Sequence, residues 1–391
     1  MAKANAWKGS EKFEKHIKVS RFILKILCVD ITTKPRRYSK FLQLAISLNQ
    51  ILTILLQIIY NITTEDEGVD ELANVIYMNY IIVGLGKLLT MYYRRQTLVQ
   101  VLKTLEEIYP ENHTEEKYNL KNYFKYYSRL ETVIWTFYRI VGPLYTTLPL
   151  LLSLMNILSI GKFTLLLPLS LWKMGNPMDN QWWLKYIFYY VIGACSCILS
   201  GLTITGCDLC LYNLITQLCM HYDLLSQRIL ELDPAKDEQK ASKELNVLIR
   251  QHLMITDLAN ETNNLFGLSI IFSVMSSSFT LCLVAYQMLD DVSMLTIVKS
   301  FILLLYESKQ VIITCYIGQK LKEYSSLVNE SLYAHRWYDG STKYRRCVLI
   351  MLACTSKPFV LNFIGIANIS VITLKEVYGN AYRLFTVFKS A

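Results

Sequence analysis

FLQLAISLNQILTILLQIIY, residues 41–60, contains no charged side chain. A helix rises about 1.5 Å per residue, so about 20 apolar residues cross the roughly 30 Å hydrocarbon core of a bilayer. Five acidic side chains follow between Asn61 and Asn74, where the apolar environment would end. This stretch therefore predicts a transmembrane helix, and it indicates that the chain is an all-α membrane protein.

The composition of the whole chain agrees with a lipid environment. Of its 391 residues, 53% are hydrophobic and 18% are charged, whereas soluble domains carry roughly 25% charged residues. The net charge of +9 would suit a nucleic-acid-binding protein. However, the basic residues lie in short segments between apolar runs, where the positive-inside rule would place them. We therefore expect membrane lipid, and no nucleic acid, as a partner of this chain.

Six further runs have the length and polarity of membrane spans. They are Val75–Tyr93, Val133–Leu158, Tyr186–Asp208, Leu265–Leu289, Met294–Ile317 and Asn362–Phe388. Upstream of all seven spans, Phe13–Val29 mixes apolar with basic side chains, which predicts an amphipathic helix lying on the membrane surface. The expected fold is therefore seven transmembrane helices preceded by one amphipathic N-terminal helix.

Lysine and arginine are distributed unequally between the segments that connect these spans. The segments on one side of the membrane hold 29 of them, and those on the other side hold two. Because basic residues accumulate on the cytosolic side, we expect a cytosolic N-terminus, and seven spans then give an extracellular C-terminus. This is the reverse of a G-protein-coupled receptor. Of the N-x-[ST] sequons, only Asn61 falls in an expected outside segment, so it is the expected glycosylation site.

The C-terminal part of the chain carries a series of short motifs. GQKL at 318–321, YAHRWY at 333–338, YRR at 344–346 and SKP at 356–358 resemble the signature that precedes the last helix of the insect odorant receptors. NAYRLFTVFK at 380–389 is similar to the final pore helix of that family. Gln217–Asn263 lacks the long insertion of the family's co-receptor, and the last helix lacks the Thr-Tyr and Gln-Phe pairs of gustatory receptors. The chain therefore resembles a ligand-tuning subunit.

The resemblance implies a function and a division of the chain. It implies an odorant receptor that acts as an odorant-gated, non-selective cation channel subunit. The receptor would form a heterotetramer with the conserved co-receptor in the plasma membrane of sensory neuron dendrites, and its ligand would be a small, volatile, hydrophobic odorant. The implied regions are a cytosolic N-terminus with the amphipathic helix (1–39), helices one to six with the ligand pocket and cytosolic helical extensions (40–318), a cytosolic anchor segment (319–361), and the pore-lining seventh helix with a short extracellular tail (362–391).

In the family that this chain resembles, the outer halves of the second, third, fourth and sixth helices enclose the odorant. Odorants carry few polar atoms, so affinity should come from apolar and aromatic contacts, with one hydrogen bond to a tyrosine or threonine hydroxyl. The alternative is that these aromatic residues pack between helices or lie in the interfacial belt. The expected ligand-binding residues are Tyr77, Tyr80, Tyr145, Thr146, Pro149, Phe188, Ile192, Val298 and Ile302.

The resemblance also places the pore at the seventh helix. Phe385, Thr386 and Val387 match the end at which apolar side chains close the pore of the family, and Val387 best fits the constriction. Glu376 lies near the middle of this helix, where it either faces water in the pore or pairs at a subunit contact. Glu307 lies in the inner part of the sixth span, where we expect it to be hydrated.

The sequence shows no pattern of catalytic or metal-ligating residues. The five histidines lie at no metal-ligand spacing, and Cys207 and Cys210 have no second pair to complete a metal or redox site. We expect no enzyme activity, no metal and no cofactor. A gustatory-like chemoreceptor and a secondary transporter remain as alternative functions. A transporter usually shows paired broken helices, and only the third span, with Pro143 and Pro149, is interrupted in this way.

Overall fold

The computed structural model describes residues 17–29, 37–63, 68–160, 166–171, 182–287, 294–363 and 367–390. Helices dominate these residues, and two strands of two residues each are the exception to the expected all-α fold. In chain order the elements are α2 (Lys18–Ile26), α3 (Arg37–Thr63), α4 (Gly68–Tyr93), α5 (Arg95–Glu107), α6 (Asn112–Lys117), α7 (Lys121–Ile160), α8 (Trp182–Leu230), α9 (Glu238–Gln287), α10 (Met294–Ala334), η1 (Trp337–Asp339), α11 (Thr342–Thr355), β1 (Asn362–Phe363), β2 (Ala367–Asn368) and α12 (Val371–Ser390).

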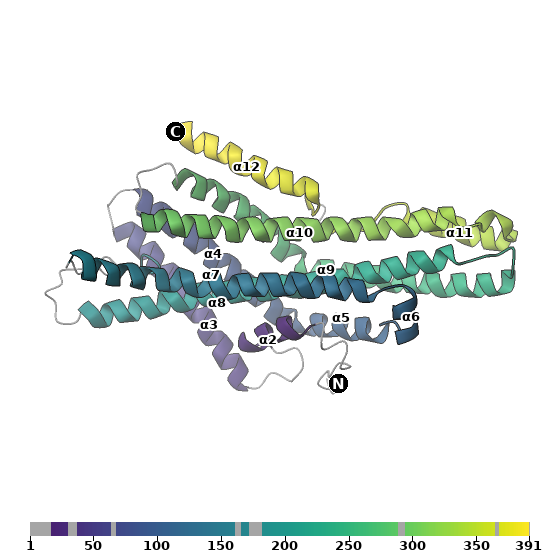
Figure 1. Ribbon diagram of the computed structural model, residues 1–391, viewed down its shortest axis with the longest axis horizontal. Coiled ribbons are helices and arrows are strands. Elements are labelled where there is room, and N and C mark those ends of the chain that lie inside the picture. The colour runs from purple at the N-terminus through teal and green to yellow at the C-terminus, as the bar shows by residue number, and fades with distance from the viewer. Residues whose placement is uncertain are drawn as a thin grey trace.

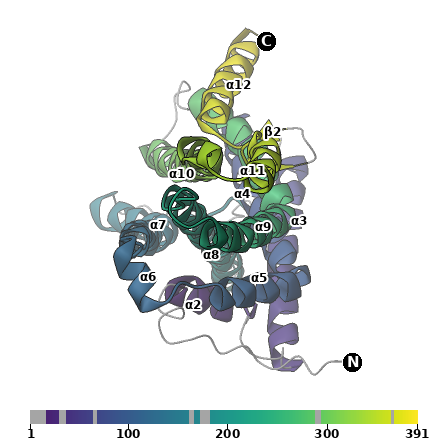
Figure 2. The same ribbon diagram turned by 90° about the vertical axis from the view of Figure 1, so that its right-hand side faces the viewer.

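Long helices lie side by side along the length of the molecule (Figure 1). α8, α9 and α10 contain 49, 50 and 41 residues, so each is about 60–75 Å long. α8 is central and packs against α4, α7, α9 and α10 (Figure 2). We name the two ends of the bundle by what lies there: the Met294 end, at the start of α10, and the α11 end, which also holds α6. Helices of this length extend well beyond a bilayer.

Apolar surface on the outside of the bundle indicates a multi-pass membrane protein. Among the described residues, five helices are long and apolar enough to cross a membrane, namely α3, α4, α8, α9 and α10. α3 shows the lipid-facing side most clearly, because Phe41 is 72% exposed and Ile62 is 76% exposed. Exposed apolar surface of this extent requires lipid as its solvent. The expected helical membrane architecture is confirmed at this level.

Hydrogen bonds between side chains attach α3 to α8. Asn49 Nδ2 donates to Ser196 Oγ at 2.7 Å, and the Thr53 hydroxyl lies 2.6 Å from the same oxygen. One turn away, Gln50 Nε2 donates to Ser200 Oγ at 3.1 Å. Polar side chains inside a membrane bundle need partners on a neighbouring helix. The polar stripe of α3 therefore decides which side of this helix faces the protein.

The N-terminal amphipathic helix is shorter and more buried than expected. The sequence predicts Phe13–Val29, whereas α2 covers Lys18–Ile26, and residues 13–16 lie outside the described part of the chain. Ile23 is fully buried against α8 at Gly206, where a Cβ atom would come within 2.5 Å of the Ile23 side chain. Phe22 stays about half exposed. α2 is thus docked on the bundle through one face, and only its other face is available to the membrane surface.

The final helix begins nine residues later than the expected span, which starts at Asn362. β1 and β2 form a short antiparallel pair in place of its first turns. The Asn362 N–H donates to Asn263 Oδ1 at 2.9 Å, and Ser370 caps α12 by accepting the Ile372 N–H at 3.3 Å. These bonds to side chains satisfy the backbone outside a helix, and the predicted start is therefore wrong.

Asn61 lies in the last turn of α3, and not in the connecting segment that the sequence predicted for 61–74. Its Oδ1 accepts a hydrogen bond from Asn74 Nδ2 of α4 at 2.8 Å. This pair stabilises helical structure on both sides of the connection, because each amide finds its partner on the neighbouring helix. The Asn61 nitrogen, which would carry a glycan, is not the atom used in this bond, and glycosylation stays a prediction.

Candidate functional site

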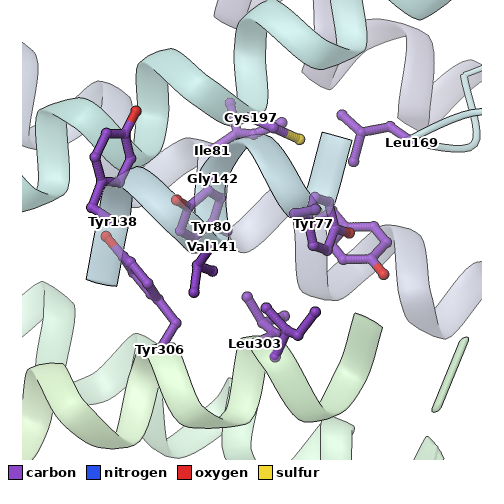
Figure 3. A pocket seen from close by; sticks show the side chains of 12 residues that line it. Tyr77, Tyr80, Ile81, Tyr138, Val141, Gly142, Leu169, Cys197, Leu303 and Tyr306 are labelled. Atoms are coloured by element: carbon purple, nitrogen blue, oxygen red, sulfur yellow. The ribbon is translucent and has the colours of Figure 1, made fainter. Parts of the chain in front are cut away.

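A cavity lies between α4, α7, α8 and α10, in the half of the bundle nearest the Met294 end. Its free volume is about 50 Å³, so the cavity is narrow and lies between closely packed side chains. Tyrosine rings of α4, α7 and α10 converge on it (Figure 3). We call it the tyrosine pocket, and its lining residues are Tyr77, Tyr80, Ile81, Tyr138, Val141, Gly142, Tyr145, Leu169, Cys197, Ile302, Leu303 and Tyr306.

Two pairs of rings set the shape of the tyrosine pocket. The ring centroids of Tyr77 and Tyr145 are 5.8 Å apart with planes at 72°, and those of Tyr80 and Tyr306 are 5.8 Å apart at 79°. Aromatic side chains favour this edge-to-face arrangement. The first pair joins α4 to α7, and the second joins α4 to α10. α4 therefore fixes two walls of the cavity at once.

The tyrosine hydroxyls of the pocket differ in how well they are bonded. Tyr138 Oη donates to the Ile198 carbonyl at 2.8 Å, and Tyr306 Oη lies 3.3 Å from the Thr205 hydroxyl. The Tyr145 hydroxyl is buried beside that of Tyr77, and it makes no hydrogen bond of normal geometry with the described residues. A buried hydroxyl without a good partner costs about 1–3 kcal/mol. A ligand that bonds to Tyr145 would recover part of this free energy.

Residues 166–171, which we call the cover segment, close the pocket towards the Met294 end. Leu169 is 1% exposed and forms part of the pocket wall. From α10, the buried Lys299 ammonium lies 3.3 Å from the Leu167 and Pro168 carbonyl oxygens. A buried ammonium needs such acceptors, so Lys299 ties the cover segment to α10.

Four of the nine expected ligand-binding residues lie together in this pocket: Tyr77, Tyr80, Tyr145 and Ile302. Thr146, Pro149 and Ile192 are buried beside the pocket without lining it. Phe188 and Val298 are 56% and 43% exposed on the outside of the bundle. Their expected place in the pocket is therefore corrected: both lie on the outward face of their helix, where lipid would meet them.

Tyr138, Val141 and Tyr306 line the pocket but were not expected from the sequence. A signal was present, because Tyr138 and Val141 precede Tyr145 by seven and four residues, and Tyr306 follows Ile302 by four. Residues at these spacings share one face of a helix. Leu169 carried no such signal, since it comes from the cover segment and not from a helix.

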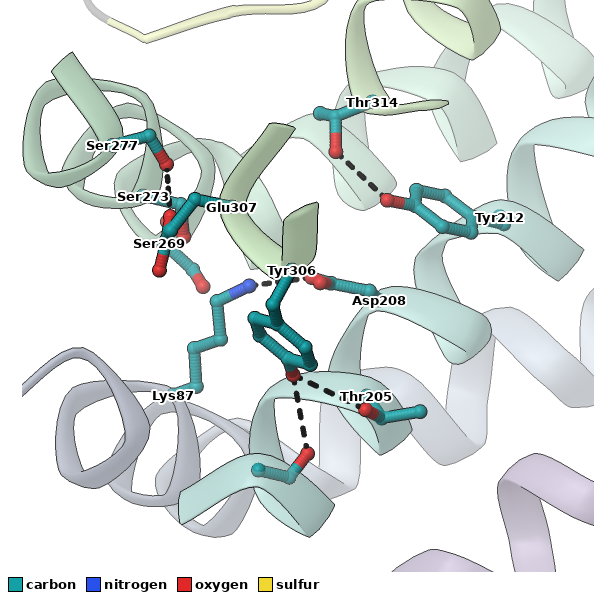
Figure 4. A network of polar contacts seen from close by, with 11 residues as sticks. Lys87, Thr205, Asp208, Tyr212, Ser269, Ser273, Ser277, Tyr306, Glu307 and Thr314 are labelled. Carbon is teal, nitrogen blue, oxygen red and sulfur yellow. Dashed lines mark hydrogen bonds and ion pairs between the residues drawn. The ribbon is translucent and has the colours of Figure 1, made fainter. Parts of the chain in front are cut away.

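Charged side chains are buried further towards the α11 end, between α4, α8, α9 and α10 (Figure 4). Lys87 Nζ lies 2.5 Å from Asp208 Oδ1, and Ser277 Oγ donates to Glu307 at 2.6 Å. Glu307 is 5% exposed, so the expectation that it is hydrated is wrong, because α9 covers α10 at this depth. Tyr306 precedes Glu307 in the chain, and it connects this buried polar cluster to the tyrosine pocket.

α12 meets the bundle with one face and leaves the other exposed. Val377 is buried and Phe385 is half-buried, on the side that packs against α9 and α10. Glu376, Thr386 and Val387 are exposed. Glu376 and Val387 are 11 residues apart, which places them on one face of the helix. The expected pore residues are thus divided: Phe385 faces the bundle, and the other three face away from it.

Comparison with known proteins decides the family. A family model described as 7tm Odorant receptor matches residues 68–382. This chain belongs to the insect odorant receptor family. Odorant receptor 85c of Drosophila melanogaster is 25% identical over 366 residues, which cover 91% of this chain and 92% of that receptor. Odorant receptor 85b of the same species is 26% identical over 341 residues, which cover 85% of each chain.

A solved structure shares the fold of this odorant receptor. The insect olfactory receptor OR5 from Machilis hrabei, in complex with eugenol, aligns with a TM-score of 0.79 at 13% identity, covering 97% of this chain and 98% of that one. The family resemblance expected from the C-terminal motifs is confirmed. Its members are receptors and not enzymes, and the relatives named above are odorant receptors other than the co-receptor.

Proposed function

We propose that this odorant receptor binds small, volatile, hydrophobic odorants in the tyrosine pocket and thereby opens a non-selective cation channel. The channel is a heterotetramer with the conserved co-receptor in the plasma membrane of sensory neuron dendrites. One observation carries the ligand proposal: an aromatic cavity contains a buried hydroxyl, that of Tyr145, which has no hydrogen bond of normal geometry in the described part of the chain.

The chemistry of the tyrosine pocket suits such a ligand. None of the described lining residues is charged, and the nearby Lys299 ammonium, 5.7 Å from the Tyr145 ring centroid, already bonds to carbonyl oxygens of the cover segment. An uncharged ligand therefore suits this pocket better than an ionic one, which would lose its hydration. Each Å² of apolar surface that an odorant buries there contributes about 25 cal/mol, and the Tyr145 hydroxyl offers one directional bond. Affinity would come from shape and apolar contact, and the hydroxyl would orient the odorant.

The proposed topology has seven spans with a cytosolic N-terminus. It adds α7 and α12 to the five helices that are long and apolar enough to cross a membrane. α7 has 40 residues and α12 has 20, and a helix of about 20 residues spans about 30 Å. The basic segments around α6 and α11 gather at the α11 end, which this topology places in the cytosol.

The exposed face of α12 supports a role at the pore. Glu376 and Val387 share that face, and around a central axis each copy of this receptor would contribute these two side chains to rings whose other positions the co-receptor supplies. A narrow apolar ring at Val387 would block ions by dewetting. Odorant binding would then shift an equilibrium between closed and open arrangements, to the extent that the odorant binds the open one better.

Current recordings from cells that express this receptor with the co-receptor would test the proposal. A panel of volatile odorants should evoke currents carried by both sodium and potassium, and the currents should appear without guanine nucleotides in the recording pipette. Responses that require GTP, or that persist when the co-receptor is omitted, would contradict the heterotetrameric channel.

Val387→Ser tests the gate. The polar hydroxyl should weaken dewetting, so resting current should rise or the permeability ratio of sodium to potassium should change. Val371→Ser is the matched control, since Val371 is also exposed on α12 but lies near the opposite end and face. Wild-type permeability ratios and resting current in Val387→Ser, at normal surface expression, would remove this residue from the gate.

A further inference from the structure

A second cavity lies towards the α11 end, between α6, α7, α8 and α10, and the proposed function does not use it. Its free volume is about 620 Å³, compared with about 50 Å³ for the tyrosine pocket. Its composition is distinct, because five tyrosines line it together with two lysines and an aspartate: Tyr118, Tyr123, Tyr126, Tyr316 and Tyr324, with Lys117, Lys320 and Asp223. We call it the interfacial cleft.

The tyrosine rings of the interfacial cleft already receive cations. Lys117 Nζ lies 4.6 Å from the Tyr118 ring centroid, and Lys320 Nζ lies 5.7 Å from that of Tyr316. Both distances are within the range of a cation–π interaction. The ring faces are therefore presented to charged groups in the cleft, as in sites that bind alkylammonium ligands.

The cleft carries both signs of charge. Asp223 accepts hydrogen bonds from Tyr123 Oη at 2.7 Å and Gln227 Nε2 at 2.9 Å. Both bonds go to Oδ2, so Oδ1 of this carboxylate remains as an acceptor among the described residues. The lysines of the cleft supply the opposite charge. Lys117 Nζ lies 2.6 Å from a Glu231 carboxylate oxygen, and Lys320 Nζ lies 2.8 Å from one of Glu323. A polyanion would be repelled by these carboxylates and by Asp223, whereas a ligand with one phosphate and one ammonium matches both signs.

Two exposed apolar stripes lead from the cleft along the outside of the bundle. Each stripe consists of four exposed side chains on one face of a helix. The stripe of α7 contains Tyr126, Val133, Ile140 and Leu144, and the stripe of α10 contains Phe301, Leu305, Ile312 and Tyr316. Tyr126 and Tyr316 belong both to these stripes and to the cleft. Tyr316 and Ile317 lie at the end of the sixth predicted span. In the proposed topology, the part of the cleft that these two residues line therefore lies at the cytosolic surface of the membrane.

We propose that the interfacial cleft binds a zwitterionic phospholipid of the cytosolic leaflet, whose headgroup is a phosphate ester bearing an ammonium, as in phosphocholine and phosphoethanolamine. The tyrosine rings and Asp223 hold the ammonium, Lys117 and Lys320 hold the phosphate, and the acyl chains lie along the two apolar stripes. The apolar stripes favour a lipid over a soluble zwitterion, because a soluble compound would leave them without a partner.

Native mass spectrometry of the full-length receptor, purified in a mild detergent and titrated with short-chain lipids, tests this inference. The probes are dioctanoyl phosphatidylcholine, dioctanoyl phosphatidylethanolamine, dioctanoyl phosphatidylglycerol and glycerophosphocholine. The first two should bind at least about fivefold more tightly than phosphatidylglycerol, and glycerophosphocholine should bind more weakly than either. Preference for the anionic phosphatidylglycerol would overturn the zwitterionic headgroup. Binding of glycerophosphocholine as tight as that of the lipids would overturn the membrane source.

Variants of the cleft locate the bound lipid. Tyr316→Leu/Tyr324→Leu removes two ring faces and keeps apolar volume, and it should weaken phosphatidylcholine about 5- to 30-fold. Lys320→Gln should also weaken it and serves as a second test if the double variant does not fold. The matched controls are Lys322→Gln on the same helix and Tyr333→Leu, whose side chain is 74% exposed, because neither residue lines the cleft. Equal lipid affinity in wild type and in both cleft variants would overturn the site.

Discussion

Removing a single oxygen atom from the tyrosine pocket tests the odorant site at the scale of one residue. In Tyr145→Phe the ring and its edge-to-face contact with Tyr77 remain. A hydrogen bond contributes about 0.5–1.5 kcal/mol net, so odorants with a hydrogen-bonding group should lose about 2- to 10-fold in potency. Hydrocarbons of similar shape should be unaffected. Dose–response curves for both classes, recorded in cells with the co-receptor, give the comparison.

The control for this substitution is Tyr93→Phe, the same change at a side chain of α4 that is 76% exposed and does not line the pocket. It should leave both classes of odorant unchanged. If Tyr145→Phe shifted both classes equally, its effect would be on gating, and the hydrogen bond to the odorant would be rejected.

Breaking the buried Lys87–Asp208 ion pair is expected to lower the free energy of unfolding of the receptor. Lys87→Met leaves the carboxylate of Asp208 buried without its partner, which should destabilise the receptor by about 3–5 kcal/mol. Lys87→Met/Asp208→Asn removes both charges and should recover much of this loss. Thermal denaturation of the detergent-solubilised receptor, followed by size-exclusion chromatography, measures these two variants together with Asp208→Asn alone. If the loss of stability in the double variant equalled the sum of the losses in the two single variants, the two side chains would not be coupled.

At the residue scale, the sequence predicted the helices that enclose the pocket better than the side chains that face it. The position of Tyr77, Tyr80 and Tyr145 in the pocket could be predicted from the depth at which each was expected in the membrane. Phe188 lies at a comparable depth but faces outward, because the rotation of a helix about its axis depends on what it packs against. The cover segment was not predictable for a related reason: its position depends on Lys299, which is remote in sequence.

At the scale of elements, Gly318 is where α10 meets the start of α12. A Cβ atom there would lie 2.6 Å from the Ile369 carbonyl oxygen, and backbone cannot move away as a side chain can. Gly318→Ala should therefore displace the segment before α12 and destabilise the receptor by about 1–3 kcal/mol. The same denaturation assay measures the change.

Gly86→Ala is the control for that prediction, since a Cβ atom at Gly86 would have no neighbour within 4 Å among the residues that the structure describes. In the middle of α4 this exchange should be neutral or stabilise the helix by up to about 1 kcal/mol. Similar melting temperatures for the two alanine variants would show that the contact at Ile369 can relax.

The existence of most helices was predictable, whereas their ends were not. Apolar runs located α3, α4 and α8 to α10 because lipid imposes a length and a polarity on every span. The delayed start of α12 was missed, since the residues before it satisfy their backbone through Asn263, which lies 99 positions away from Asn362. Hydropathy carries no information on a bond of that kind.

At the scale of the whole molecule, the strongest prediction concerns orientation. The 29 basic residues on one side, against two on the other, should place the N-terminus in the cytosol and the C-terminus outside the cell. A C-terminal epitope should be labelled on intact cells, and an N-terminal epitope only after permeabilisation. Treatment with a glycosidase should change the mobility of the wild-type receptor but not of Asn61→Gln. An N-terminal tag that is accessible on intact cells would contradict the proposed topology.

The continuity of α8 has a mechanical consequence. This helix runs without a proline from Trp182 to Leu230, and it lines the pocket at Cys197. The part from Cys197 to Leu230 is a rod about 50 Å long, whereas α7 contains two prolines, Pro143 and Pro149. If a ligand tilts this rod by about 3°, its far tip moves by about 2.5 Å, comparable to the helix shifts that rearrange subunit interfaces. With a pivot close to the pocket, α8 would act as a lever: a molecule that separates two helices there by a fraction of an ångström would displace contacts at the α11 end by several times that distance.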